Sequence, residues 1–398
     1  MAEVFAGPIK GSTGIHQVQS IRFPAADMAI VISKGGIQFA GQASPAPETR
    51  SVGYLAAFQA GRELARRGLP QLPRGRRLTM SQEASPVPDR AEFAGSTEPF
   101  RRELLAHCYR MVGSVDEAED LVQETFLRAW RAYDGFEGRS SVRTWLYQIA
   151  SNTCLTALEH RARRPLPSGL AGPSHEAGQP PAPDRDVSWL QPIPDALVTP
   201  ESADPAAIAV SRESLRLALI ASFQYLNPRQ RAVLILREVL AFPAADVATM
   251  LGTSTAAVKS TLQRARARLA EVAPAPERII EPTEPRAREL LSQYIAGFEN
   301  ADTTALEKAL RADAAIEMVG TRTWFSGRAT CLRYLGHVIG SPGDWRMAPT
   351  LANGQPAAVA SYHDSAYGLG VLTVTATGIA RITVFGGGPD LAASFGLA

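Results

Sequence analysis

The sequence predicts a multidomain protein in which two all-α blocks are followed by a C-terminal α+β domain. At 398 residues the chain is too long for one compact core and should hold two to four domains. Apolar residues recur with helical spacing through Glu98–Arg164 and again through Ile208–Val272. After Arg286, helical patterns alternate with short β-rich runs such as Val371–Ala376, which is typical of an α+β domain.

Composition favours a soluble cytoplasmic protein that does not contact a membrane. No leader with a basic start and an apolar stretch is present, and no apolar run approaches the ~20 residues of a membrane span. The three cysteines, Cys108, Cys154 and Cys331, form no CxxC pair and have no histidine at ligand spacing. Neither a disulfide framework nor a metal site is therefore predicted, and no cofactor is implied.

Two proline-containing segments separate the blocks. Prolines recur through residues 165–206, where each fixes φ and removes a backbone donor, so regular structure should not persist in this linker. A second hinge covers residues 273–285. The predicted units are therefore residues 98–164, 207–272 and 286–398.

Residues 1–79 do not have the pattern of one complete domain. In Val18–Phe39 apolar and polar residues alternate as they do in strands, on both sides of Asp27. Tyr54–Leu78 is rich in Arg, Gly and Leu but has no continuous apolar face. Met80 opens a polar, proline-containing leader, residues 80–97. We favour the interpretation that residues 1–79 come from an over-extended reading frame.

The first block contains a helix with two distinct faces. Gly113 to Glu117 form a predicted capping box, in which the Ser114 hydroxyl accepts from the backbone of Glu117 and the Glu117 carboxylate reaches back. The apolar stripe that follows is Ala118, Leu121, Val122, Phe126 and Trp130. The string DEAEDLVQETFLRAW resembles region 2.2 of sigma-70 family proteins, which docks on the large subunit of RNA polymerase. The resemblance implies polymerase binding by Asp120, Gln123 and Glu124.

The string FEGRSSVRTWLYQIASNTCLTALEHRARR resembles regions 2.3 and 2.4 of the same family. It implies a loop that captures an unstacked promoter base and a long helix from about Ser141 that lies along the separated strand. The residues implied to contact the minus-10 element are Phe136, Arg139, Ser140, Asn152, Arg161, Arg163 and Arg164.

The second block contains a predicted helix-turn-helix. Asn227 caps a helix with Pro228 at its first position and an end near Val239. A helix, a turn at Gly252, a cap at Ser254 and a basic second helix are then predicted from the string AADVATMLGTSTAAVKSTLQRARARL. The block resembles sigma region 4. Its expected base readers at the minus-35 element are Ala256, Lys259, Ser260 and Gln263, with Arg264 and Arg266 on the backbone.

The C-terminal segment resembles the SnoaL-like domains of the nuclear transport factor fold. The opening helices of that fold correspond to ARELLSQYIAGFENADTTALEKAL. A strand and a helix of the fold correspond to EMVGTRTWFSGRATCLRYL. The resemblance implies a cone whose mouth can hold a small, unknown ligand. The titratable candidates for catalysis are His337, Asp344, His363 and Asp364, but none has a visible partner, so a regulatory cavity is favoured. Val18–Gln42 resembles the strand half of a similar fold, so a partial SnoaL-like remnant is a second interpretation of residues 1–79.

Together these resemblances indicate an extracytoplasmic-function sigma factor with an appended SnoaL-like domain. The expected partners are core RNA polymerase, promoter DNA and the protein's own C-terminal domain. Trp189, in a Trp-Leu-Gln-Pro stretch of the linker, is the expected regulatory contact on an otherwise flexible tether. No catalytic residue is needed for this function. Two alternatives stay open: a bifunctional protein whose C-terminal domain is a small-molecule enzyme, and a helix-turn-helix repressor that never touches polymerase.

Overall fold

The computed structural model of the chain describes residues 12–13, 18–25, 28–33, 38–39, 90–159, 161–199, 205–272 and 279–396. The chain divides into two compact units, Met1–Glu83 and Ala84–Ala398. In the first unit β2 (Val18–Ala25) pairs antiparallel with β3 (Met28–Ser33), and β1 (Ser12–Thr13) pairs with β4 (Gln38–Phe39). The strand pattern predicted around Asp27 is confirmed. Tyr54–Leu78 and the leader up to residue 89 lie outside the described residues.

The first helical block of the second unit contains four helices: α2 (Arg90–Thr97), α3 (Arg101–Val112), α4 (Val115–Ala132) and α5 (Val142–Leu158). Ser114 caps α4 by accepting from Glu117 N at 3.3 Å, and Ser141 caps α5 in the same way. The predicted capping box at Ser114 is only half formed, because the Glu117 carboxylate pairs with Arg161 and Arg164 instead. The helix starts predicted at Ser114 and Ser141 are confirmed.

The linker has almost no regular structure in its described part. Residues 161–199 contain a 3-10 turn, Pro167–Gly169, and the single-turn helix α6 (Asp195–Val198). The prediction from the proline content is confirmed.

The second helical block contains α7 (Pro205–Glu213), α8 (Leu217–Phe223), α9 (Pro228–Leu234), α10 (Ala244–Met250) and α11 (Thr255–Val272). A π-helical turn, Ile235–Val239, extends α9 to the predicted end. Asn227 and Gln230 form a complete capping box at the start of α9. Gly252 has a φ of 59°, which gives the left-handed turn between α10 and α11, and Ser254 caps α11. The predicted helix-turn-helix is confirmed.

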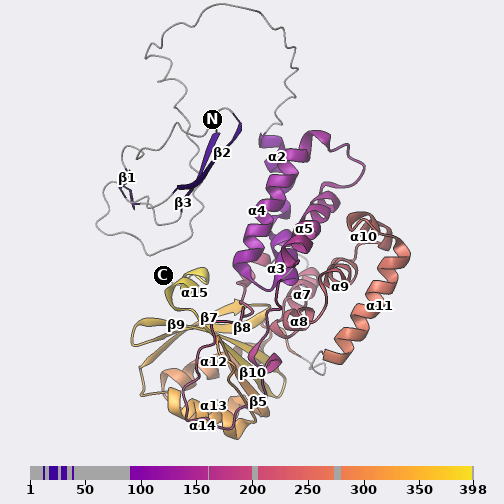
Figure 1. Cartoon of the computed structure of the whole chain (residues 1–398). Helices are drawn as coiled ribbons and strands as arrows, with labels where there is room; N and C mark the ends of the chain where they lie inside the picture. The colour runs from indigo at the N-terminus through magenta and orange to yellow at the C-terminus, as the bar shows by residue number, and fades with distance from the viewer. Residues whose placement is uncertain are drawn as a thin grey trace, which may run out of the picture. The chain divides into compact units, whose positions relative to one another are not determined.

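The C-terminal domain is a six-stranded mixed sheet in the order β6-β5-β10-β9-β8-β7. Its strands are β5 (Leu310–Val319), β6 (Trp324–Ser326), β7 (Trp345–Ala352), β8 (Gln355–Tyr362), β9 (Ser365–Thr375) and β10 (Gly378–Gly386). β10 and β5 run parallel, and the other neighbours run antiparallel. Its helices are α12 (Pro285–Glu299), α13 (Thr303–Ala309), α14 (Arg328–Val338) and α15 (Gly388–Ser394). Figure 1 shows α12, α13 and α14 gathered on one side of this sheet.

The two faces of the sheet are buried in different cores. Along β8, Ala358 and Ala360 pack toward α12 and its neighbours, whereas Ala357 and Val359 belong to the core that also contains the two helical blocks. This alternation follows from the two-residue period of a strand. The sheet therefore joins the C-terminal domain to the helical blocks through an apolar face. None of the helices in the described ranges is long and apolar enough to cross a lipid bilayer.

Candidate functional site

The predicted polymerase-binding residues lie on the outer face of α4. Asp120 and Gln123 are exposed, and Glu124 is partly exposed in an ion pair with Arg128, with 2.7 Å between Oε1 and Nε. On the opposite face Ala118 and Val122 are buried. The three polar residues are therefore placed together and are available to a partner, and they contribute little to the core.

The predicted minus-35 residues share one face of α11. All six are exposed, whereas Val258, Leu262 and Ala265 are buried on the other face. Arg266 forms an ion pair with Glu238 at the end of the π-helical turn. The face consists of Ala256, Lys259, Ser260, Gln263, Arg264 and Arg266.

The predicted minus-10 residues lie in two separate places. Phe136 packs on Trp145 with 4.8 Å between ring centroids, and Arg139 and Ser140 are exposed beside it. The arginines after α5 are engaged: Arg161 and Arg164 pair with Glu117 of α4, and Arg163 lies 4.3 Å from the centre of the Tyr225 ring. The structure does not bring all seven residues onto one surface.

Asn152 joins the two helical blocks directly. Its Nδ2 atom donates to the Met250 carbonyl of α10 at 3.0 Å. Beside this contact, Asn152 of α5 and Arg264 of α11 line one groove together with Asn227 and Arg229. Two residues predicted to contact different promoter elements, Asn152 and Arg264, therefore line the same groove.

The interface between the helical blocks also contains aromatic contacts and buried cations. Phe242 packs edge-on against Tyr147 with 5.2 Å between centroids. Arg110 donates to Ser214 Oγ, and Arg231 donates to the Met111 carbonyl. Burial lowers the pKa of each arginine to about 10. The partners of both guanidiniums among the described residues are uncharged hydroxyl, amide and carbonyl oxygens, so closure of this interface includes a desolvation cost.

The tip of the β7–β8 hairpin is inserted between the helical blocks. Asn353 is fully buried, and its Nδ2 atom donates to Tyr109 Oη of α3 at 2.7 Å and to the Leu215 carbonyl before α8 at 2.8 Å. Its Oδ1 atom accepts from Ile193 N of the linker at 3.0 Å, and its own N–H donates back to Ile193 O. One side chain thus bonds the first block, the linker and the start of the second block.

The residues beside Asn353 extend this contact, and we call Asn353–Gln355 the clamp. Gly354 N donates to Asp195 Oδ1 at 2.7 Å, and Gln355 Oε1 accepts from Leu217 N at 3.0 Å. A Cβ at Gly354 would lie 2.6 Å from Arg212 O, so only glycine permits this approach. An Asn-Gly pair is a recognisable hairpin signal, but its insertion between distant helices has no signature in the sequence.

The linker is a packed strap in its described part, so the expected flexible tether is a wrong prediction. Leu190 and Ile193 are fully buried, whereas Trp189, the predicted anchor, is half-buried and donates to Asp184 O. Gln191 accepts from Ser114 Oγ and Val115 N at the start of α4. The apolar neighbours of Trp189, with Gln191, make the main contacts that sequence reasoning missed.

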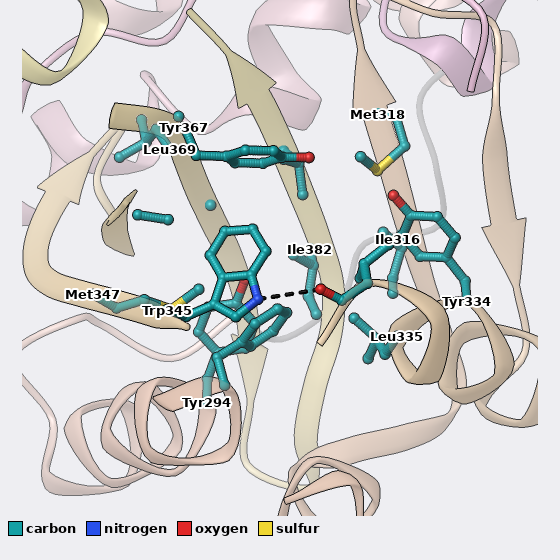
Figure 2. Close-up of a pocket in the computed structure, with 16 residues that line it drawn as sticks. Tyr294, Ile316, Met318, Tyr334, Leu335, Trp345, Met347, Tyr367, Leu369 and Ile382 are labelled. Atoms are coloured by element: carbon teal, nitrogen blue, oxygen red, sulfur yellow. Dashed lines mark hydrogen bonds between the residues drawn. The ribbon is translucent and has the colours of Figure 1, made fainter. Parts of the chain in front are cut away.

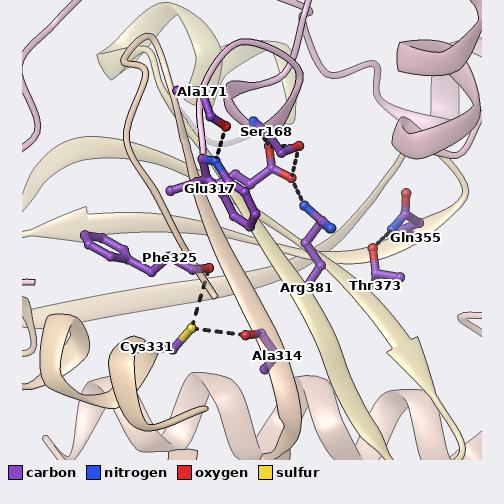
Figure 3. Close-up of polar contacts among 10 residues, drawn as sticks. Ser168, Ala171, Ala314, Glu317, Phe325, Cys331, Gln355, Thr373 and Arg381 are labelled. Atoms are coloured by element: carbon purple, nitrogen blue, oxygen red, sulfur yellow. Dashed lines mark hydrogen bonds and ion pairs between the residues drawn. The ribbon is translucent and has the colours of Figure 1, made fainter. Parts of the chain in front are cut away.

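A second polar cluster fixes the linker to the sheet (Figure 3). The carboxylate of Glu317 on β5 is fully buried, pairs with Arg381 of β10 and accepts from Ser168 N and Oγ at 3.2 and 3.1 Å. Trp324 Nε1 donates to the Ala171 carbonyl at 2.8 Å. The linker is therefore attached to the C-terminal domain at both of its ends.

The C-terminal domain also contains a cavity between its helices and the sheet (Figure 2). None of the four titratable candidates lines it. His337 is exposed on α14, Asp344 accepts from Ser341 N, and His363 and Asp364 are exposed in the β8–β9 turn. None of these four residues is therefore placed to act on a molecule inside the cavity.

A buried histidine predicts how stability changes with pH. His107 is fully buried against Ser151, and burial, with Arg110 nearby, lowers its pKa from 6.5 to about 3. The folded state therefore binds fewer protons than the unfolded state, so stability should fall as pH decreases from about 6.5 toward 3, by up to about 1.4 kcal/mol per pH unit.

Urea unfolding at pH 7.5 and 5.5 measures this effect. His107→Gln should lose less stability than the parent between the two pH values, and the exposed control His337→Gln should behave like the parent. Equal losses in the parent and His107→Gln would contradict the assignment.

Comparison with known proteins decides the family. The family descriptions Sigma-70 region 2 and Sigma-70, region 4 match residues 97–164 and 216–269. The sequence is 53% identical over 272 residues to "ECF RNA polymerase sigma factor SigG" of Mycobacterium tuberculosis, covering 68% of this chain and 73% of that protein. This chain belongs to the ECF RNA polymerase sigma factors. The repressor alternative is thereby excluded.

Two further similarities of this sigma factor are to a second ECF sigma factor, SigJ. It is 31% identical over 218 residues to SigJ of Mycobacterium tuberculosis, covering 54% of this chain and 61% of that protein. The crystal structure of SigJ matches with a TM-score of 0.50 at 23% identity, covering 78% of this chain and 100% of SigJ. The C-terminal domain of this sigma factor is an α+β domain built on a six-stranded mixed sheet, as the sequence predicts.

Proposed function

We propose that this sigma factor binds core RNA polymerase through α4 and directs initiation at promoters with minus-10 and minus-35 elements. The first block would melt and hold the minus-10 element, and α11 would lie in the major groove at the minus-35 element. Energy for melting comes from capturing bases and strand phosphates, so no hydrolytic step is required. The exposed polar face of α4 and the basic face of α11 support these assignments.

We further propose that the C-terminal domain keeps the two DNA-binding blocks in a closed, inactive arrangement. Elements centred about 25 base pairs apart are separated by about 85 Å along B-form DNA. Blocks that touch through Asn152 and Met250 cannot reach both elements at once. Initiation therefore requires the blocks to separate, and whatever holds them together is inhibitory.

The observation that carries this proposal is the clamp. The side-chain amide of Asn353 accepts one hydrogen bond from the linker and donates one to each helical block. These three segments must move apart when the blocks separate. Such a fully buried and fully satisfied polar contact is lost all at once when the segments separate. Closure also buries Arg110 and Arg231, which donate to Ser214 and Met111 across the interface but have no carboxylate partner among the described residues, so their desolvation offsets part of the stabilisation by the clamp. The balance between the two sets the fraction of open sigma factor.

Run-off transcription with purified core polymerase and genomic DNA tests the promoter function. Discrete start sites should occur when the full chain is added and should share two elements at a fixed spacing. Start sites that do not depend on the added chain would overturn the assignment.

Salt dependence should separate base readers from phosphate contacts on α11. Arg264→Ala should weaken binding to all DNA sequences and lower the log–log salt slope by about one unit. Lys259→Ala should instead relax specificity at one position, at a cost of about 1 to 3 kcal/mol. Binding titrations on promoter and scrambled duplexes at several salt concentrations measure both effects.

The exposed Arg288 of α12 supplies a matched control, because Arg288→Ala removes the same charge from a helix of the C-terminal domain. Its slope and specificity should equal those of the parent. If the Lys259 and Arg264 variants behave alike and neither responds to promoter sequence, the readout assignment is wrong.

A further inference from the structure

A pocket lies where the linker, the second helical block and the sheet of the C-terminal domain meet. Its walls come from residues 163–169, residues 217–225, the end of α11 and the strands β5, β9 and β10. Its volume is about 220 Å³, which is the share of liquid volume of about seven water molecules. The pocket therefore suits a molecule of about seven to ten non-hydrogen atoms.

This pocket and the cavity of the C-terminal domain lie on opposite faces of the sheet. On β5, Ile316 and Met318 line the cavity, whereas Glu317 between them lines the pocket. On β10, Ile382 lines the cavity, whereas its neighbour Arg381 lines the pocket. Because neighbouring side chains of a strand point to opposite faces, the two are separate sites.

The sheet contributes a fixed ion pair to the wall of this pocket (Figure 3). The carboxylate of Glu317 is fully buried, pairs with Arg381 and accepts hydrogen bonds from Ser168 N and Oγ. The negative charge of Glu317 is therefore already compensated by groups of the protein.

Arg163 brings a second positive charge to the pocket. Its guanidinium lies 4.3 Å from the centre of the Tyr225 ring, and its Nη2 atom donates to the Gly169 carbonyl at 3.0 Å. These two contacts fix the direction of the guanidinium. Its side chain is exposed, and among the described residues its other N–H groups have no partner and it pairs with no carboxylate. The guanidinium is therefore oriented and available to an anion.

The charge and the polarity of the wall restrict what can bind. Among the described residues that line the pocket, three carry a charge: Arg163, Glu317 and Arg381. Since Glu317 and Arg381 neutralise each other, one positive charge is left, which favours a ligand with one negative charge. Much of the remaining wall is apolar and consists of Pro165, Leu166, Leu217, Ala218, Ala221 and Val272.

We propose that this pocket binds a small organic monoanion, a carboxylate on a short hydrocarbon body. The carboxylate would accept two hydrogen bonds from the Arg163 guanidinium, whose planar geometry matches it. The hydrocarbon body would pack against Leu217 and Ala221 of α8. A phosphate monoester fits less well, because its additional negative charge would meet the carboxylate of Glu317.

The walls of this pocket belong to parts that separate when the helical blocks open. Arg163 ends the first block, Ala221 lies in the second and Arg381 lies on the sheet. Thr373, which also lines the pocket, accepts from Gln355 Nε2 of the clamp at 3.0 Å. A molecule that contacts all three parts binds the closed arrangement and should lower transcription. This consequence, unlike the binding site itself, rests on the function proposed above.

Calorimetric titration of the full-length protein with benzoate tests the site. Benzoate has one ring and one negative charge, benzamide is its neutral counterpart of the same shape, and phenyl phosphate carries a larger negative charge. Benzoate should bind with a dissociation constant of about 1 mM or below, at least tenfold more tightly than benzamide and more tightly than phenyl phosphate. Absence of benzoate binding, equal affinity for benzamide, or tighter binding of phenyl phosphate would overturn the proposal.

Three variants locate the binding. Arg163→Gln removes the charge and should weaken benzoate binding to the level of benzamide, and Ala221→Leu fills the pocket and should abolish it. Arg185→Gln is the matched control, because Arg185 is an exposed arginine of the linker that does not line the pocket. If benzoate binds equally to the parent and to Arg163→Gln, the assigned site is wrong, even where Ala221→Leu misfolds.

Transcription with and without benzoate separates the site from its consequence. At ten times its dissociation constant, benzoate should shift the closed–open equilibrium about tenfold toward the closed arrangement. Transcription by the parent and by Arg185→Gln should fall, and transcription by Ala221→Leu should not respond. Binding without a fall in transcription keeps the site and removes its link to closure. Failure of benzoate to bind, together with increased transcription by a variant of Asn353, removes the site and keeps the proposed function.

Discussion

Asn353→Gly is expected to raise transcription several-fold when core polymerase is limiting. Asn353 has a φ of 56°, which glycine adopts without strain, so the substitution deletes the side chain and keeps the turn. Loss of its three buried side-chain hydrogen bonds should destabilise the closed arrangement by about 2 to 4 kcal/mol. That change shifts the closed–open equilibrium by a factor of ten or more. Multiple-round run-off assays measure the activity.

Asp364→Gly is the matched control. Asp364 also has a positive φ of 61°, but it lies exposed in the β8–β9 turn away from the helical blocks. Its activity should equal that of the parent. The thermal stability of Asn353→Gly should fall as its activity rises. A variant that is destabilised but transcribes at or below the parental level would show that the clamp does not restrain the sigma factor.

Simultaneous replacement of Asp120, Gln123 and Glu124 with alanine is expected to abolish co-purification with core polymerase. These side chains lie on the outer face of α4, and the one ion pair they make, from Glu124 to Arg128, is an exposed pair of small energy. Thermal stability should therefore stay within about 0.5 kcal/mol of the parent. Affinity capture and thermal unfolding measure the two properties on the same preparation.

Glu289→Ala with Gln293→Ala is the control for this triple variant. These residues form a hydrogen-bonded pair one turn apart on α12. Their replacement should leave polymerase binding unchanged. Retained binding by the triple variant would show that another surface docks on polymerase.

Local structure was predictable because it depends on neighbouring residues. The caps predicted at Ser114, Asn227 and Ser254 fix where helices begin, and all three are confirmed. The helix that the resemblance implies from about Ser141 also begins with a cap at that residue. The helix-turn-helix and the strands of the last domain follow from periodicity in the same way. The capping box at Ser114 is only half formed because the Glu117 carboxylate forms ion pairs with two arginines after the end of α5. These charge-assisted contacts are stronger than a hydrogen bond to the backbone of Ser114.

Long-range contacts could not be predicted from local pattern. The linker looked like a tether because prolines exclude regular structure, yet proline-rich backbone can pack closely, as Leu190 and Ile193 do. Asn353 has an ordinary turn sequence, and its role depends on Tyr109 and Leu215, which lie 244 and 138 residues away in the chain. Predicted promoter residues such as Asn152 face the other block for the same reason.

The distance between the two helical blocks, before and after polymerase binding, shows directly whether the free sigma factor is closed. Spin labels at Ala132, at the end of α4, and at Ala270, near the end of α11, would occupy exposed positions on the two blocks. The free protein should give one short distance, which lengthens on core polymerase and lengthens partly in free Asn353→Gly. If the distance in the free protein already equals that of the polymerase-bound state, the free sigma factor is open and the clamp does not restrain it.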